Sequence, residues 1–208
     1  MHPLKPQDVL VVLKLCAVAA TSQWAGAYPS MAGLGLQLGL SSSEVHAAIG
    51  RARRSGLLHQ QLPAQGASRI KALSGDAPDG WNHAVRSLRP AQPNATAIRE
   101  FLVHGLKYAF PVERGELTRG IPTSYAAPPL RALIASGQDP IPVWPFPEGA
   151  ERGVTFEPLY RTVPFAAISD PLLYELLVIA DALRDGRVRE RKIAQEQLRE
   201  RLGLIRVE

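Results

Sequence analysis

The chain has 208 residues, of which 46% are hydrophobic and 21% charged, and this composition excludes a disordered chain. The net charge is +5, and residues 1–71 carry all of it, because they hold seven basic and two acidic side chains. Residues 170–208 hold eight of each and are neutral. A basic module followed by a balanced one is typical of a protein that contacts phosphate with one part and protein with the other.

The first predicted element is a helix over residues 5–21, where apolar side chains recur at helical spacing after Pro6. The same apolar run, followed by Ala-Gly-Ala at 25–27, also resembles a secretory signal peptide. Asp8 precedes the run and Lys14 interrupts it, whereas the apolar segment of a signal peptide should be uncharged. We therefore favour an amphipathic helix and expect a cytoplasmic protein with no membrane segment.

Two short helices are predicted next, over residues 30–38 and 42–55, with a tight turn between them at 39–41. Gly39 supplies the residue tolerant of positive φ that such a turn needs, and Gly35 supplies a small residue where the two helices touch. The residues suited to cap the helices are Ser30 for the first and Ser41 or Ser42 for the second.

These residues, continued by Arg-Ala-Arg-Arg-Ser-Gly-Leu-Leu at 51–58, resemble the winged helix-turn-helix regulators of the MarR-like and related groups. The resemblance covers residues 5–73, about a third of the chain. In keeping with it, residues 57–62 and 68–73 are predicted to form two strands around a hairpin tip at 63–66. The resemblance implies that the helix over 42–55 enters the major groove of double-stranded DNA.

The same resemblance implies a set of DNA-binding residues in this chain. Side chains in the first turns of the second helix would face base edges, namely Ser42, Ser43, Glu44 and His46. Basic side chains at its end and in the wing would hold phosphates, namely Arg51, Arg53, Arg54, Arg69 and Lys71. The alternative is that the winged helix binds a protein and that these arginines form a solvated face.

The remainder of the chain carries weaker signals. Residues 74–93 are predicted to be a linker, because they are rich in Gly, Pro, Asp and Asn. A helix is predicted over 96–110, whereas 112–169 is so dense in Pro and Gly that it should hold no long helices or central strands. A long helical pattern covers 171–202, where Asp170 can cap it and Gly186 can kink or split it.

The expected fold class is therefore mainly α with a small β-wing, an α+β protein. The expected division is a winged helix-turn-helix over 1–73, a linker over 74–93, and a helical and irregular domain over 94–208 that serves ligand binding, partner binding or dimerisation. Cys16 is the only cysteine and is expected to be buried, with an exposed redox-sensing thiol as the alternative.

No set of residues converges on a reaction, so no enzyme, cofactor or metal site is expected. His104 has no oriented partner in the sequence, and Ser124 lacks the nucleophile-elbow pattern. The favoured function is a DNA-binding transcriptional regulator that acts as a homodimer. The apolar first half of the last helix is one suggested dimer surface. The alternative is that this apolar half is buried within the chain. The other function considered is an antitoxin-like or adaptor protein that holds a partner protein with residues 95–203 and binds DNA secondarily.

Overall fold

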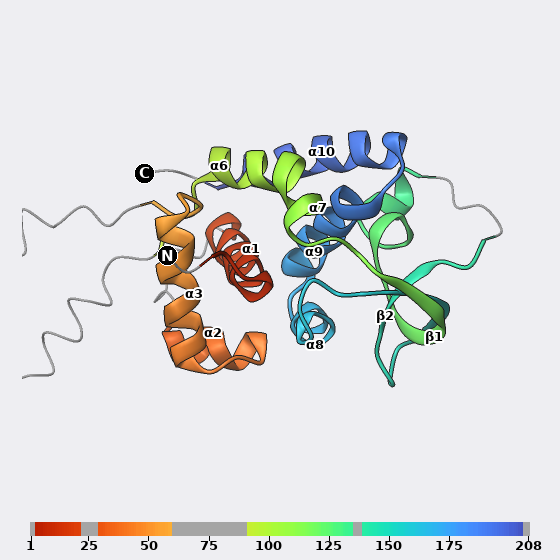
Figure 1. Cartoon of the computed structure of the whole chain (residues 1–208), viewed down its shortest axis with the longest axis horizontal. Coiled ribbons are helices and arrows are strands. Elements are labelled where there is room, and N and C mark those ends of the chain that lie inside the picture. The colour runs from red at the N-terminus through yellow and green to blue at the C-terminus, as the bar shows by residue number, and fades with distance from the viewer. Residues whose placement is uncertain (1–2, 22–28, 60–90, 135–138, 206–208) are drawn as a thin grey trace, which may run out of the picture.

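The computed structural model describes residues 3–21, 29–59, 91–134 and 139–205 and has an α+β fold, in agreement with the expected class (Figure 1). Short 3-10 turns lie at Ser124–Ala126 and Leu130–Ala132. The other elements are, in chain order, α1 (Pro6–Ala20), α2 (Met31–Leu38), α3 (Ser42–Arg54), α6 (Ala95–Glu100), the π-helical turn η2 (Phe101–Gly105), α7 (Leu106–Ala109), β1 (Arg114–Pro122), β2 (Pro142–Pro145), β3 (Glu151–Phe156), α8 (Val163–Ile168), α9 (Pro171–Asp185) and α10 (Val188–Leu202).

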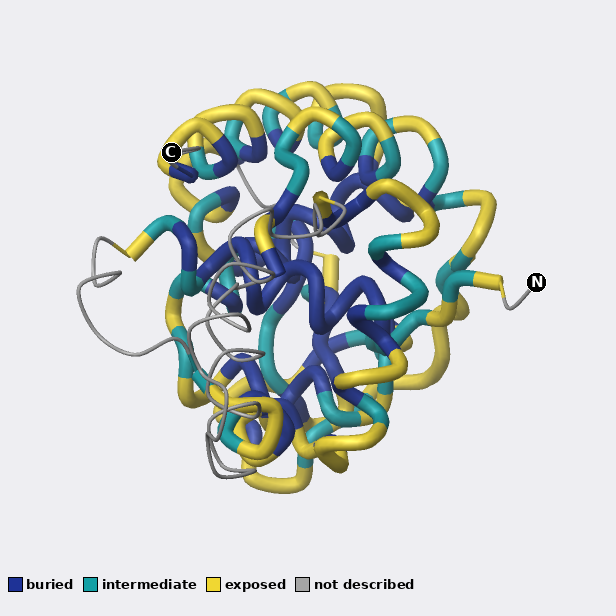
Figure 2. The backbone as a smooth tube through the Cα atoms, turned by 90° about the vertical axis from the view of Figure 1, so that its left-hand side faces the viewer, coloured by how far each residue is buried: buried dark blue, intermediate teal, exposed yellow. Residues whose placement is uncertain are grey.

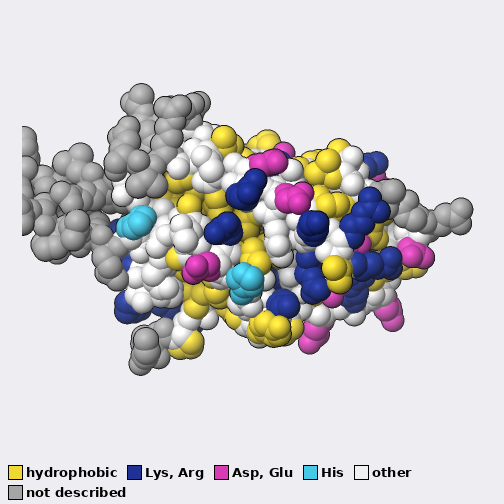
Figure 3. All heavy atoms as spheres, turned by 90° about the horizontal axis from the view of Figure 1, so that it is seen from above, with side chains coloured by type: hydrophobic (Ala, Val, Ile, Leu, Met, Phe, Trp, Pro, Cys, Tyr) yellow, Lys and Arg dark blue, Asp and Glu magenta, His cyan; other side chains and the backbone are white. Residues whose placement is uncertain are grey.

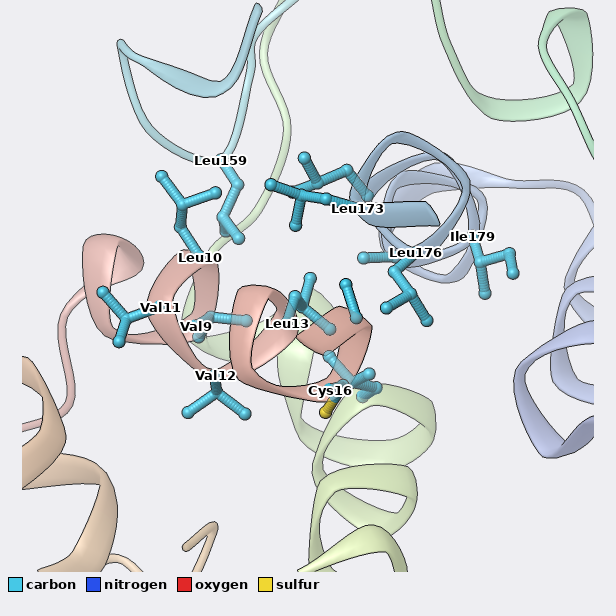
Figure 4. Packing of buried hydrophobic residues seen from close by; sticks show 14 of the residues in the cluster. Val9, Leu10, Val11, Val12, Leu13, Cys16, Leu159, Leu173, Leu176 and Ile179 are labelled. Atoms are coloured by element: carbon cyan, nitrogen blue, oxygen red, sulfur yellow. The ribbon is translucent and has the colours of Figure 1, made fainter. Parts of the chain in front are cut away.

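Helix α1 lies inside the molecule and contacts α3 and α9 (Figure 1). In the close-up of its packing, Leu10 points toward Leu159, and Leu13 points toward Leu173 of α9 (Figure 4). The helix predicted over residues 5–21 is thus confirmed. It differs from the expected amphipathic helix because other elements cover it on nearly all sides, and its apolar run is buried almost throughout.

Two charged residues of α1 are buried, and each is paired. Lys14 places its Nζ 2.7 Å from the carboxylate of Asp170, at the start of α9. Asp8 accepts two hydrogen bonds from the guanidinium of Arg51 in α3, at 2.8 and 2.6 Å. The two charges, one before the apolar run and one within it, therefore join α1 to α9 and to α3.

No helix in the described ranges combines the length and the apolar character that crossing a membrane would require.

Beyond α3 the chain pairs with a segment far along the sequence. Leu58 forms an isolated antiparallel bridge with Pro93, and the N–H of His59 donates to the carbonyl of Gln92 at 2.9 Å. The remainder of the predicted wing and most of the predicted linker, residues 60–90, lie outside the described residues. Within the described residues, the start of the strand predicted over 57–62 therefore pairs with the end of the predicted linker.

The helix predicted over residues 96–110 is present as three consecutive segments, α6, η2 and α7. In its middle, the N–H of Leu106 donates to the carbonyl of Phe101, which makes one π-helical turn. The buried side chains of this helix are four residues apart, at Ile98, Leu102 and Leu106. They pack against the common core, which also contains residues of α9 and α10.

A three-stranded sheet lies within residues 112–169, where no central strand was predicted, so that prediction was wrong. Strand β1 is antiparallel to both β2 and β3, and β2 and β3 are parallel to each other. The prolines of β1 and β2 lie at strand ends, where the missing N–H interrupts the ladder least. Gly120 lets the strands approach closely, because a Cβ there would collide with the backbone carbonyl of Trp144.

The helical pattern predicted over residues 171–202, which Gly186 was expected to kink or split, is split there into two helices, α9 and α10, that pack on each other (Figure 1). The backbone leaves the helical conformation at Gly186, where ψ is 151°. A Cβ at this position would collide with the carbonyl of Ala182, so glycine permits the sharp break. The predicted cap is confirmed, since Asp170 accepts hydrogen bonds from two backbone N–H groups of α9, at 3.1 and 3.0 Å.

A buried polar cluster fixes the sheet against α9. The carboxylate of Asp181 accepts hydrogen bonds from the hydroxyl of Thr123 (2.8 Å), the indole N–H of Trp144 (2.6 Å) and the guanidinium of Arg184 (2.9 Å). Burial raises the pKa of Asp181, while Arg184 and the other two donors act in the opposite direction. Arg184 also donates to backbone carbonyls, among them that of Phe110 at 2.9 Å. The cluster therefore joins α9 to the backbone after α7 as well as to the sheet.

One hydrophobic cluster contains side chains from both sides of the predicted linker. Leu13 of α1, Val45 of α3 and Leu176 of α9 belong to it, and each is at most 2% exposed. Figure 2 shows the buried segments together at the centre, beneath an exposed outer layer. The described residues of 1–73 and of 94–208 therefore share a core.

Candidate nucleic-acid interface

The corner between α2 and α3 is built around two glycines, as the sequence predicts. Gly39 ends α2 with a φ of 64°, a conformation that L side chains rarely adopt. Gly35 lies so close to the corner that a Cβ there would be 2.5 Å from the carbonyl oxygen of Leu40. The start of α2 is capped by Ser30, whose hydroxyl accepts from the N–H of Gly33 at 3.0 Å. These contacts fix the direction in which α3 leaves α2.

The N-terminus of α3 is closed by a capping box between Ser41 and Glu44. The Ser41 hydroxyl accepts from the N–H of Glu44 at 3.2 Å, and the Glu44 carboxylate accepts from the N–H of Ser41 at 2.8 Å. The bond from the Ser41 N–H is the largest of the effects that lower the pKa of Glu44, followed by a bond from the Ser41 hydroxyl. Glu44, predicted to face base edges, therefore has its carboxylate engaged in this cap.

The other three residues predicted to face base edges are exposed. Ser42, Ser43 and His46 lie in the first turns of α3 with their side chains in solvent. Val45 and Ile49 point the opposite way and are buried in the core. The structure thus brings two hydroxyls and an imidazole together on the exposed face at the start of α3, where a helix in the major groove presents its side chains to bases.

The predicted phosphate-binding residues have different surroundings. Arg54 is exposed at the end of α3, and Arg53 is half-buried. Arg51 is only 11% exposed at its side chain, and its hydrogen bonds to Asp8 raise the pKa of its guanidinium. Arg51 therefore holds α3 on α1. The wing residues Arg69 and Lys71 lie outside the described residues.

One basic residue near α3 was missed by sequence reasoning. Arg161 precedes α8, is exposed, and contributes its positive charge to the lowered pKa of Glu44. The neighbouring Thr162 packs on the α2–α3 corner, because its Cγ2 would lie 3.1 Å from a Cβ on Gly39. Arg161 is more than a hundred positions from α3, so no local pattern could have placed it there.

Basic side chains also gather far from α3. Seen from above, Lys and Arg side chains cluster toward the end of the molecule that carries the sheet in Figure 1 (Figure 3). Helix α10 carries Arg189, Arg191 and Lys192 in its first turns. A binding test with a polyanion therefore needs a control variant on this second basic surface.

The residues considered for catalysis do not assemble into a site. His104 is exposed on η2, and Ser124 is buried with a φ of 50°. Among the described residues, no histidine or lysine side chain hydrogen-bonds to Ser124, and no group of three or more His, Cys, Asp and Glu side chains is placed to hold a metal ion. Cys16 is buried as expected, and burial raises the pKa of its thiol to about 12.

The apolar first half of the predicted C-terminal helix is covered within the chain. Leu173, Leu176, Leu177 and Ile179 of α9 are each at most 2% exposed. The dimer surface suggested for this segment is therefore wrong, and its alternative, burial within the chain, is confirmed.

The sequence matches no family model, and searches of curated proteins and of solved structures found no match either.

Proposed function

We propose that this chain is a transcriptional regulator that binds double-stranded DNA through a winged helix-turn-helix, with α3 in the major groove. One observation carries this proposal: α3 begins, after the Gly39 corner, with an exposed face formed by Ser42, Ser43 and His46. Hydroxyl and imidazole groups can exchange hydrogen bonds with base edges. The excess positive charge of residues 1–71 supports the proposal, because phosphate contacts supply most of the affinity for DNA.

The roles proposed for the basic residues follow from their surroundings. Arg54, exposed at the end of α3, is proposed to contact a phosphate, with Arg53 beside it. Arg69 and Lys71 keep the role of wing contacts that the resemblance implies. Arg51 is proposed to act indirectly, because its bidentate pair with Asp8 holds α3 in place.

The test is a binding titration of the purified protein with two DNA duplexes, at two salt concentrations. One duplex carries the sequence upstream of the protein's own gene, called the upstream DNA, and the other carries a scrambled sequence. We expect tighter binding to the upstream DNA and a steep loss of affinity as salt rises. His46→Ala should weaken binding to the upstream DNA only, whereas Arg54→Ala should weaken binding to both duplexes alike. Absence of binding at either salt concentration, or binding that ignores salt, would overturn the proposal.

We further propose that the regulator acts as a homodimer that matches two half-sites of an operator. Because α9 is buried within the chain, the dimer surface must lie elsewhere. Light scattering of the eluted protein, alone and with a duplex carrying one or two half-sites, tests this. A monomer in both complexes would contradict it.

A second candidate function, an adaptor that holds a partner protein, is favoured by exposed apolar side chains beside the α2–α3 corner. Leu36 of α2 is 79% exposed, and Phe165 and Ile168 of α8 are 52% and 60% exposed. Helices α2 and α8 contact each other, so these side chains lie on neighbouring elements. Leu36→Gln should abolish co-purification of a partner, whereas Leu117→Gln, at an exposed position in the sheet, should not.

A further inference from the structure

The segment just before α8 lies against the α2–α3 corner. Thr162 packs on Gly39, the residue that turns the chain from α2 into α3, and its Cβ would lie 3.2 Å from a Cβ on Gly39. The contact between α2 and α8 continues this junction, and Figure 1 shows the two helices near each other along the lower edge of the molecule. A part of the chain far from α3 in sequence is therefore placed beside the start of the proposed DNA-reading helix.

Arg161 is the charged residue of this segment. Its side chain is exposed, and its guanidinium lies over the ring of Tyr160, 5.8 Å from the ring centroid. Among the described residues, no carboxylate lies within 4.0 Å of this guanidinium. Its positive charge is therefore not neutralised by a direct ion pair within the described part of the chain, although it acts on Glu44 from a longer distance.

We infer that Arg161 is a DNA-backbone contact, which holds a phosphate beside the base pairs that Ser42, Ser43 and His46 read. The inference rests on the proposed function. It extends the interface to the C-terminal part of the chain, which sequence reasoning assigned to ligand, partner or dimer contacts. Thr162, the next residue after Arg161, packs on the corner, and the charge of the exposed Arg161 acts on Glu44 in the first turn of α3, so a polyanion approaching these turns would pass near Arg161.

A different role for Arg161 predicts a different experimental result. If Arg161 only offset the negative charge of Glu44, its loss would weaken the cap of α3 and lower the midpoint of thermal unfolding. A phosphate contact predicts the reverse: an unchanged midpoint, and a loss of affinity that is equal on every DNA sequence. Because each neutralised phosphate adds about 0.9 to the slope of log affinity against log salt, removing one contact should reduce that slope by about this amount.

The experiment measures affinity of the full chain for its upstream DNA and for a scrambled duplex over a series of salt concentrations. The variants are Arg161→Ala, Arg161→Lys, which keeps the charge, and Arg189→Ala, a matched control at an exposed arginine of α10. We expect Arg161→Ala to weaken binding several-fold on both duplexes with the smaller slope, Arg161→Lys to retain most of the slope, and Arg189→Ala to match the wild type.

Three outcomes would overturn the inference while the proposed function stands: a wild-type slope in Arg161→Ala, equal losses in Arg161→Ala and Arg189→Ala, or a lowered unfolding midpoint with no change of slope. Absence of DNA binding by the wild type at every salt concentration is a separate result, and it would overturn the proposed function and this inference together.

Discussion

The carboxylate of Asp8 is fully buried, and its two hydrogen bonds to Arg51 connect α1 to α3. Asp8→Asn should lower the free energy of unfolding by about 3 kcal/mol or more, because it leaves a nearly buried guanidinium without its charge partner. Chemical denaturation followed by far-UV circular dichroism measures this difference.

The matched control is Asp185→Asn, because Asp185 pairs with Arg114 at the surface, where the two side chains are 37% and 50% exposed. Exposed pairs contribute at most about 1 kcal/mol, so the control should remain close to the wild type. Equal effects of the two substitutions would show that burial does not distinguish these pairs.

The buried thiol of Cys16 gives a pH dependence. Its pKa rises from an ordinary value of 9.0 to about 12 in the folded chain, because burial disfavours the thiolate. Between pH 9 and pH 12 the thiol keeps its proton in the folded state and loses it in the unfolded state. The contribution of Cys16 to the free energy of unfolding is therefore full below pH 9 and falls as the pH rises toward 12. Above pH 9 the free energy of unfolding should fall by an amount that approaches about 1.4 kcal/mol per pH unit.

Denaturation at several alkaline pH values, compared between the wild type and Cys16→Ala, isolates this contribution. The wild type should lose stability more steeply with rising pH, and its thiol should react with a chromogenic thiol reagent only after unfolding. Rapid reaction in the folded state would instead indicate the exposed redox-sensing thiol that the sequence left as an alternative.

The corner between α2 and α3 offers a test at the scale of the element, because α2 carries two glycines in different surroundings. Gly35→Ala should destabilise the chain, since the new Cβ would lie 2.5 Å from the Leu40 carbonyl oxygen and would push α3 away. Gly33→Ala is the control: its Cβ meets only the Ser30 hydroxyl, at 3.3 Å, and alanine favours a helix over glycine by about 1 kcal/mol. The midpoint of thermal unfolding should be lower for Gly35→Ala than for Gly33→Ala. Equal midpoints would contradict the assigned role of Gly35.

The elements differ in how well the sequence predicts them. Helices α1, α2 and α3 were located to within a residue or two, because apolar spacing, serine caps and Gly39 are local signals. The sheet was missed because its strands are rich in proline and glycine, and only pairing between distant segments shows that these residues occupy strand ends and close approaches.

The residues of the candidate site also differ in how well the sequence predicts them. The exposed positions of Ser42, Ser43 and His46 follow from helical periodicity, which the sequence displays. Arg51 was predicted to hold a phosphate and Arg161 was not singled out, because their surroundings depend on Asp8 and on the corner at Gly39, both distant in sequence.

At the scale of the whole molecule, Lys14 and Asp170 link the first helix to the start of α9. Asp170→Asn keeps a side chain that caps helices well but removes the charge that Lys14 contacts at 2.7 Å. We expect a loss of about 1.5 to 3 kcal/mol in the free energy of unfolding, the range typical of hydrogen bonds to charged groups. In a Lys14→Met background the same substitution should cost less, and a double-mutant cycle measures the difference. Additive effects would show that the pair does not couple the two helices.

The π-helical turn in the middle of the 95–109 helix has a consequence for the lengths that this helix can tolerate. Four residues overshoot one α-helical turn by about 40°, so side chains at 98, 102 and 106 would drift around a regular helix, whereas a π turn accommodates roughly one residue more. Deletion of Gly105 would let the turn revert to a regular α-helix with apolar spacing of four and then three, which also keeps one face inward. The helix should thus accept the loss of a single residue here, although a deletion in α1 or α9 would rotate half of a buried helix out of register.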